Sequence, residues 1–208
     1  PEVPAVSALV LNSDDLRAHP KATGVVLEYS TETELRWMQR VLPDTRRVGV
    51  LFNPAQNQPR MTRAMLQARD LGLTLNARPV ANPRELPDNL AYLADHADVL
   101  WGISDSTVLT PQTAQSLLLF SFRNQIPFVG LSRSWVKAGA LYALERDYQD
   151  IGRQCGELAV QVLKGAAPSS LPVQSPRKAG VVLNLKTARH LKIEFPVAVR
   201  QAALDVVE

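Results

Sequence analysis

The chain has 208 residues, of which 46% are hydrophobic and 21% are charged, and 23 Lys and Arg against 20 Asp and Glu give a net charge of +3. At roughly 100–200 residues per domain, this length predicts one large domain or two small ones. One cysteine and three histidines exclude an internal disulfide and a structural Cys/His zinc site. So small a charge surplus argues only weakly for nucleic-acid binding. No apolar run reaches the ~18 residues of a membrane span.

Short apolar runs alternate with segments of helical periodicity, which indicates a parallel α/β architecture. The first strands are expected at Ala5–Leu11 and Val25–Glu28. Thr31 and Glu34 form a capping box that begins a helix, which ends before Pro43. The continuous apolar run at residues 48–52 predicts a strand covered on both faces.

The same alternation continues to the end of the chain. Helices are expected at residues 61–71, Arg84–Asp95, Pro111–Arg123, Ile151–Val162, Lys186–Leu191 and Val197–Val207, and strands at Leu73–Pro79, Asp98–Gly102, Pro127–Gly130, Ala140–Leu144 and Gly180–Leu183. Ala166–Arg177 is rich in proline and serine, which predicts a linker. Cys155 falls on the apolar face of its helix, so its side chain is expected to point inward.

Polar residues follow several of the predicted strands. In open parallel sheets, ligands bind outside the carboxyl ends of the strands, so these positions are candidate ligand contacts. They are Asn12-Ser13-Asp14-Asp15, Asn53 to Asn57, Ser104-Asp105-Ser106-Thr107, Ser132-Arg133-Ser134-Trp135 and Asp147-Tyr148. The same residue types also cap helices and form turns. Both interpretations stay open at each position.

The three tryptophans have different expected environments. Trp37 lies between two apolar positions of a helix, so it is either the edge of the core or an exposed anchor for a partner. Trp101 ends an apolar strand and is expected to be buried. Trp135 is expected in a polar loop, where its ring could stack on a ligand.

Catalytic patterns are absent from the sequence. There is no GxSxG, HExxH, P-loop or GxGxxG motif, and His19, His96 and His190 have charged neighbours and no nucleophile at a recognisable spacing. We therefore expect a protein that is not an enzyme and has neither a metal nor a cofactor.

Several ordered segments carry a resemblance to a known family. They are Thr23-Gly24-Val25, Leu42-Pro43, Arg47 to Pro54, Ile126 to Val129, Val136 to Leu141, Asp147-Tyr148, Ile151 to Gln154, Val162 to Gly165 and Asn184 to Ala188. With these segments, the chain resembles the substrate-binding proteins of ABC transporters, in the branch with the type I periplasmic-binding fold that includes tryptophan- and tyrosine-binding members. Order and spacing agree from about residue 20 to the end.

The resemblance implies two α/β lobes joined by three crossovers, with the solute held between the lobes and captured by hinge closure. Residues 1–30 would be a remnant of the first lobe and a crossover, and 31–145 the second lobe. Residues 146–170 would be the helix that returns to the first lobe, and 171–208 the last strand of the second lobe with C-terminal helices. Because full-length members have a further βαβαβ run before Ala5–Leu11, we expect the N-terminal part of the first lobe to be missing here.

The same resemblance implies a solute-binding component of an ABC transporter that takes a small polar ligand, an amino acid being one candidate. The implied ligand residues are Asn53, Gln56, Asn57, Asp105, Ser106, Thr107, Ser132, Ser134, Trp135, Asp147 and Tyr148. Asp105 or Asp147 would pair with an ammonium group. A ligand carboxylate would meet the helix after Asn53 or the hydroxyls of Ser106 and Thr107. Arg133 and the Glu145-Arg146 pair depart from the family pattern, which leaves the ligand's identity open.

The implied partners are a small molecule and a membrane permease, without nucleic acid. The implied location is the periplasm, with a signal peptide absent from this chain and a lipid anchor allowed. The alternative is a truncated interaction or sensory domain that docks to a protein partner, or to a second copy, through the face left by the missing segment. An effector domain of a transcription regulator is a third reading, but no helix-turn-helix is visible in the sequence.

Overall fold

The computed structural model describes residues 3–11 and 13–208, without the side chains of Asp14 and Asp15. The chain forms two compact units, and each is described by itself. Unit 1 contains Pro1–Ser30 and Arg146–Gly180, and unit 2 contains Thr31–Glu145 and Val181–Glu208. The chain therefore passes from one unit to the other three times.

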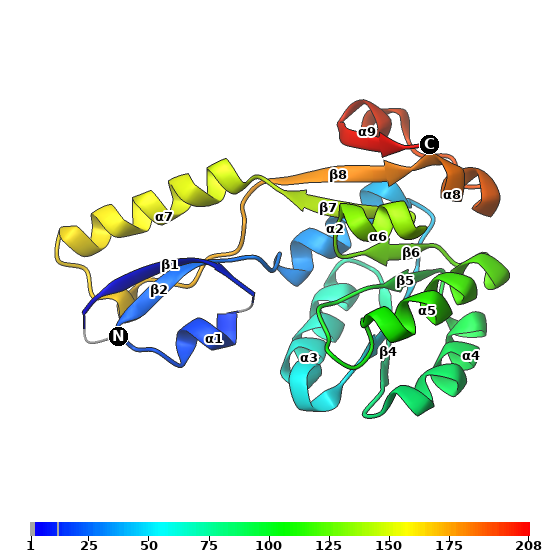
Figure 1. Ribbon diagram of the computed structural model, residues 1–208, viewed down its shortest axis with the longest axis horizontal. Helices are drawn as coiled ribbons and strands as arrows, with labels where there is room; N and C mark the ends of the chain where they lie inside the picture. Colours follow the sequence, from blue (N-terminus) through cyan, green and yellow to red (C-terminus); the bar gives the residue numbers. More distant parts are fainter. Residues whose placement is uncertain (1–2, 12) are drawn as a thin grey trace. The chain divides into compact units, whose positions relative to one another are not determined.

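Unit 1 is built on two parallel strands, β1 (Ala5–Val10) and β2 (Ala22–Val26), joined through α1 (Ser13–Arg17) (Figure 1). The long helix α7 (Tyr148–Leu163) and the short helix η2 (Pro168–Ser170) follow later in the chain. Val25, Ile151 and Leu158 form its core, and Cys155 packs against them. The expected inward direction of Cys155 is confirmed, and burial raises the pKa of its thiol.

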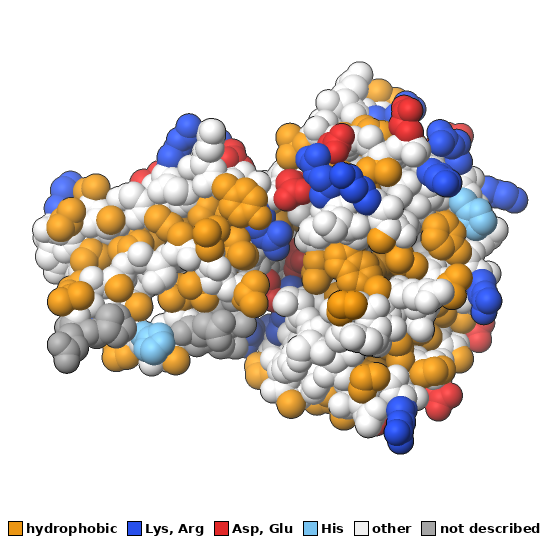
Figure 2. All heavy atoms as spheres, viewed as in Figure 1, with side chains coloured by type: hydrophobic (Ala, Val, Ile, Leu, Met, Phe, Trp, Pro, Cys, Tyr) orange, Lys and Arg blue, Asp and Glu red, His pale blue; other side chains and the backbone are white. Residues whose placement is uncertain are grey.

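Unit 1 also carries hydrophobic side chains at its surface (Figure 2). The exposed ones include Leu9, Leu11, Val160 and Leu163. Exposed apolar patches on a protein surface often mark sites where another protein binds. A protein partner or second copy that covers them stays a prediction.

Unit 2 is built on a seven-stranded sheet with the order β4-β3-β5-β6-β7-β8-β9. Its strands are β3 (Arg47–Phe52), β4 (Thr74–Pro79), β5 (Val99–Trp101), β6 (Phe128–Gly130), β7 (Tyr142–Arg146), β8 (Ala179–Asn184) and β9 (Ala203–Val207). The pairs from β4 through β7 and the pair β8–β9 are parallel, and the arrows of β7 and β8 point in opposite directions in Figure 1. The expected α/β class with a mostly parallel sheet is confirmed.

Helices flank this sheet (Figure 1). They are α2 (Thr31–Val41), α3 (Pro54–Asp70), η1 (Pro83–Glu85), α4 (Leu86–His96), α5 (Pro111–Asn124), α6 (Arg133–Ala138), α8 (Leu185–Leu191) and α9 (Val197–Gln201). Asn53 and Thr110 cap α3 and α5 with their side chains, each directly before a proline at the first helical position. The helix α5 begins where the sequence predicts, whereas α3 begins at Pro54, ahead of the expected helix at residues 61–71, because Asn53 and Pro54 start it earlier.

The strand register gives the sheet two different faces. On one face, Leu100 and Phe128 are paired in register and pack with Leu117 of α5 in a large apolar cluster. On the opposite face, Trp101 is paired with Val129, and Val129 with Tyr142. Paired residues of parallel strands point to the same face, so Trp101 and Tyr142 share one surface of the sheet. Both are fully buried, which confirms the expectation for Trp101.

The expected helix over Val197–Val207 is wrong in its second half. The helix α9 ends at Gln201, and Ala203–Val207 forms the edge strand β9, which pairs with β8. Exposure alternates along these five residues, with Leu204 and Val206 turned to solvent. This alternation of exposure with a period of two is that of a half-buried edge strand.

The expected loop at Ser132–Trp135 is also wrong, because α6 begins at Arg133. Trp135 is therefore helical, and its ring packs edge to face on Phe128 with 5.5 Å between ring centroids. It adds to the apolar cluster of the sheet.

Trp37 is partly buried, and the Arg40 guanidinium lies 4.5 Å from its ring centroid, so it occupies the edge of the core. Within the described residues, no helix is both long enough and apolar enough to cross a membrane.

Candidate functional site

The polar residues that follow β3 and β5 form one hydrogen-bonded network in unit 2. One oxygen of the Asp105 carboxylate accepts the Asn53 backbone N–H at 2.6 Å and the Asn57 side-chain amide at 2.9 Å. The other oxygen accepts the backbone N–H groups of Thr107 and Val108, both at 2.9 Å. A carboxylate has about four acceptor positions, and these four bonds occupy them. Asp105, which is 6% exposed, therefore holds two loops together.

Asn53 connects the same network to α3. Its side-chain oxygen accepts the Ala55 N–H at 2.9 Å, and its amide donates to the Thr107 hydroxyl at 2.7 Å. The backbone N–H groups of Gln56 and Asn57 donate to the Asn53 carbonyl. Because Pro54 has no N–H, the first turn of α3 has its donors paired already. The expected contact between a ligand carboxylate and this helix end would have to displace these bonds.

The exposed part of the network consists of Gln56 and Ser106. The Gln56 amide donates to the Ser106 hydroxyl, and its oxygen accepts the Ser106 backbone N–H at 3.1 Å. Thr107 lies beside them and is partly buried. Gln56, Ser106 and Thr107 can give up one of their hydrogen bonds within the protein and bond to a ligand instead. Asn53, Asn57 and Asp105 hold these three residues in position.

The residues of α6 are separate from this network. Ser132 precedes α6 without a side-chain capping bond, and Ser134 is exposed. Arg133 pairs with Asp205 of β9 at 2.6 Å and with Glu145 of β7 at 3.7 Å. Within the described part of the chain, no hydrogen bond joins these residues to the Asp105 network. The structure thus brings together six of the expected site residues and leaves Ser132, Ser134 and Trp135 as a second group.

The remaining expected residues belong to unit 1. Asp147 caps α7, since its carboxylate accepts the Asp150 N–H at 2.9 Å, and Tyr148 is 55% exposed. Hydrogen bonds from Arg177 hold the pKa of Asp150 below its usual value. Asn12 lies outside the described residues, as do the side chains of Asp14 and Asp15.

Four residues that the sequence analysis did not select form a second polar cluster in unit 2. Glu34 of α2 and Arg60 of α3 make an ion pair at 2.7 Å, with side chains only 17% and 12% exposed. The Arg60 guanidinium lies 5.4 Å from the centroid of the Trp101 ring. The indole N–H of Trp101 and the hydroxyl of Tyr142 are buried and have no hydrogen-bond partner among the described residues.

A sequence signal for this cluster exists in α2. Glu34 precedes the buried Met38 by four residues and the buried Val41 by seven, so it shares their helix face. A carboxylate on an apolar helix face requires a partner, and Arg60 supplies it. The pairing itself spans 26 residues and depends on how α2 packs against α3, so no local pattern predicts it.

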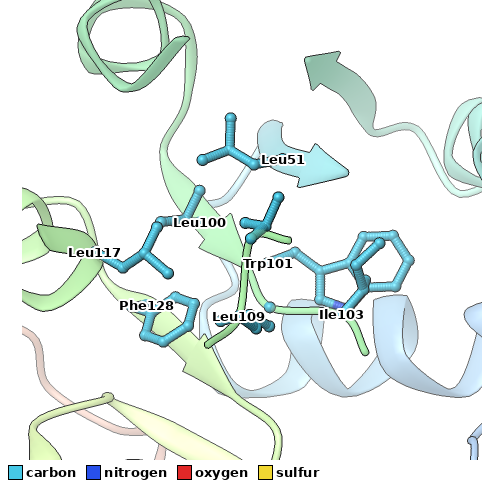
Figure 3. Close-up of a pocket in the computed structure, with 9 residues that line it drawn as sticks. Leu51, Leu100, Trp101, Ile103, Leu109, Leu117 and Phe128 are labelled. Carbon is cyan, nitrogen blue, oxygen red and sulfur yellow. The ribbon is translucent and has the colours of Figure 1, made fainter. Parts of the chain in front are cut away.

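An apolar cavity of about 10 Å³ lies near Trp101, between Leu100, Leu117 and Phe128 (Figure 3). This volume holds about one water molecule, and its lining is apolar, so it cannot bind a solute. Among the described residues, no group of three His, Cys, Asp or Glu could hold a metal ion.

Comparison with known proteins gives a family match. The model of the family described as ABC transporter substrate binding protein matches residues 5–207. A tyrosine-binding protein of Clostridioides difficile strain R20291 is 22% identical over 167 residues, which are 79% of this chain and 48% of that protein. The chain thus spans about half the length of this curated relative.

Solved structures share the fold. A Streptococcus pneumoniae ABC domain in complex with L-tryptophan is 22% identical, with a TM-score of 0.72 over 98% of this chain and 72% of that one. A ligand-free, open substrate-binding protein with adhesive properties from Clostridium difficile is 20% identical, with a TM-score of 0.74 over 99% and 72%. A conserved domain protein from Vibrio cholerae is 26% identical, with a TM-score of 0.70 over 91% and 64%.

Proposed function

The chain belongs to the family of ABC transporter substrate-binding proteins, and from this premise we propose that it is the solute-binding component of an ABC transporter. The observation that carries the proposal is the family match, which extends over residues 5–207 and so includes both units. The proposed role is binding rather than catalysis, in keeping with the family. Delivery of the solute to a membrane permease, a periplasmic location and ligand capture by hinge closure belong to the same proposal.

The proposed ligand is an amino acid. One relative is named a tyrosine-binding protein, and one structural neighbour was solved with L-tryptophan. In this chain, Gln56, Ser106 and Thr107 provide amide and hydroxyl groups that suit the polar groups of such a ligand. Ser132, Ser134, Trp135, Asp147 and Tyr148 stay proposed contacts.

The proposed part of Asp105 differs from the first expectation. Its carboxylate already accepts four N–H groups, so it does not offer a lone pair to a ligand ammonium. We propose instead that Asp105, Asn53 and Asn57 hold Ser106 and Thr107 in place. Substitution of Asp105 would then weaken ligand binding indirectly, because it would destabilise the loop that carries Ser106 and Thr107.

A thermal-shift screen of the chain against the twenty L-amino acids tests the proposed function, with calorimetry to confirm each positive. An amino acid at about 100 times its Kd adds roughly 2.7 kcal/mol of stability and raises the melting temperature by several degrees. Gln56→Ala should weaken binding severalfold, whereas Gln58→Ala, an exposed position on the same helix, should not change it. If no amino acid shifts a chain that melts cooperatively, the proposal is wrong and the interaction-domain reading gains support.

A further inference from the structure

The face of the sheet that carries Trp101 and Tyr142 contains two buried hydrogen-bond donors without acceptors. Figure 3 shows the Trp101 ring pointing away from Leu117 and Phe128, which belong to the apolar face. Trp101 and Tyr142 are 2% and 1% exposed. The indole N–H and the phenol O–H have no partner within the described residues. Buried polar groups are almost always paired in folded proteins, so two such donors on one face need an explanation.

The charged pair Glu34–Arg60 lies against the Trp101 side chain on this face. Arg60 reaches the Trp101 ring, at 5.4 Å from its centroid, and Glu34 accepts from Arg60 at 2.7 Å. Tyr142 lies on the same face of the sheet as Trp101, with Val129 between them in the register, and burial, with the negative charge of Glu34 in addition, raises the pKa of its phenol. Arg60 and Glu34 thus lie on the face of the sheet that carries both Trp101 and Tyr142.

This cluster continues from the exposed network. Arg60 follows Gln56 by four residues in α3, so the two side chains lie one turn apart on the same helix face. Ser106, the partner of Gln56, follows Trp101 by five residues in the chain. A molecule that touches Gln56 and Ser106 is therefore one helical turn from Arg60.

The chemistry of the cluster matches one class of ligand. An indole N–H and a phenol O–H need an acceptor, and the guanidinium beside them favours an acceptor with negative charge, such as a carboxylate. Glu34 provides the complementary negative charge. A zwitterion inserted into the Glu34–Arg60 pair keeps the charge balanced, because its carboxylate replaces Glu34 on Arg60 and its ammonium takes a bond from Glu34. A simple anion in the same place would leave Glu34 without a counter-charge, and a neutral sugar would leave both Glu34 and Arg60 without one.

We infer that Trp101, Tyr142, Arg60 and Glu34 recognise the carboxylate and ammonium groups of an α-amino acid. This inference rests on the proposed function and adds the residues that bind the two charged groups. The exposed network around Gln56 then meets the rest of the ligand. A structural ion pair alone accounts for Glu34 and Arg60, but it does not account for the two donors beside it.

Tyr142→Phe tests the inference, because it removes one oxygen and keeps the ring. The free variant should melt at the temperature of the wild type or above it, since an unpaired buried hydroxyl is lost. Its affinity for the amino acid that binds the wild type should fall about tenfold, as for a lost hydrogen bond to a charged group. Tyr92→Phe, at a partly exposed position of α4, is the matched control and should change neither value.

Ligand analogues give a second readout that does not depend on folding. The methyl ester and the N-acetyl derivative of the same amino acid each lack one of the two charges, so each should bind at least about tenfold more weakly. Wild-type affinity in Tyr142→Phe, or full affinity for both derivatives, overturns the inference and leaves the proposed function intact. A Tyr142→Phe variant that melts clearly lower would show that the hydroxyl has a partner, which also overturns it. If the wild type binds no amino acid, both proposals fall.

Discussion

The Asp105 carboxylate accepts the backbone N–H of Asn53 at 2.6 Å, across 52 residues of sequence. This bond joins the end of β3 to the loop after β5, which are neighbouring strands of the sheet. The second carboxylate oxygen accepts the backbone N–H groups of Thr107 and Val108, in the loop that follows Asp105. A single buried carboxylate therefore sets the position of Ser106 and Thr107 relative to the first turn of α3.

Asp105→Ala should destabilise the protein because it leaves four N–H donors without their acceptor. Hydrogen bonds to a buried charged group and the cost of unpaired donors predict a loss of about 2–4 kcal/mol in the free energy of unfolding. Urea denaturation followed by circular dichroism measures it. Asp70→Ala, at an exposed position near the end of α3, is the control and should cost less than about 0.5 kcal/mol. Equal losses in the two variants would contradict the joint role of Asp105.

Trp135→Ala should lower stability more than it lowers ligand affinity. The ring packs on Phe128 and on the apolar cluster of the sheet while keeping part of its surface exposed. The loss of such a partly buried ring predicts a decrease of about 2–4 kcal/mol in the free energy of unfolding. Chemical denaturation gives this number, and calorimetry with the bound amino acid gives the affinity. A variant that keeps its stability and loses only affinity would show that Trp135 contacts the ligand and contributes little to packing.

Two glycines of unit 1 should respond to alanine with opposite signs. A Cβ at Gly24 would lie 2.0 Å from the Ser7 carbonyl oxygen of the paired strand, so Gly24→Ala must push β1 and β2 apart. We expect a loss of about 1–3 kcal/mol. Gly156 lies inside α7, where an added Cβ would meet no atom within 4 Å beyond its chain neighbours and the backbone of its own helix, so Gly156→Ala should gain roughly 0.5–1 kcal/mol. Thermal melts of the two variants beside the wild type decide the signs.

Most of the fold could be predicted from local patterns. The strand at residues 48–52 is a continuous apolar run, and α5 begins with Thr110 and Pro111, so periodicity and capping chemistry suffice there. The end of the chain was mispredicted because five residues are too few for a period to stand out. Ala203–Val207 becomes a strand because β8 offers a free edge, which is a tertiary cause.

The candidate site could be predicted only in part. The rule that ligands meet the carboxyl ends of parallel strands selected Asn53 and Asp105, and the structure does bring them together. Which atoms can still bond to a ligand depends on hydrogen bonds between loops that are far apart in the sequence. The sequence around Asp105 therefore could not predict that Asn53 and Asn57 already donate to its carboxylate. Trp101 and Tyr142 were not selected because only the register of three strands places them on one face.

Asp98 should make the stability of unit 2 depend on pH in the acid range. Burial alone would raise the pKa of its carboxyl group, but hydrogen bonds from the Arg47 side chain and from the backbone N–H groups of Arg46 and Arg47 outweigh burial and lower the pKa below the ordinary 3.8. The folded state thus binds its proton less readily than the unfolded state. The stability that Asp98 provides is complete above pH 3.8 and is lost as the pH falls through the lower folded-state value.

Asp98→Asn removes this titration. At pH 6 it should cost about 1 kcal/mol, since the carboxylate is about a third exposed and its pair with Arg47 is partly screened. Between pH 5 and pH 2.5, roughly the range in which paired carboxylates titrate, the melting temperature of the variant should fall less steeply than that of the wild type. Asp70→Asn is the control, and it should follow the wild-type curve. Parallel curves for wild type and Asp98→Asn would mean that Arg46 and Arg47 do not stabilise the charged form of Asp98 in the folded protein.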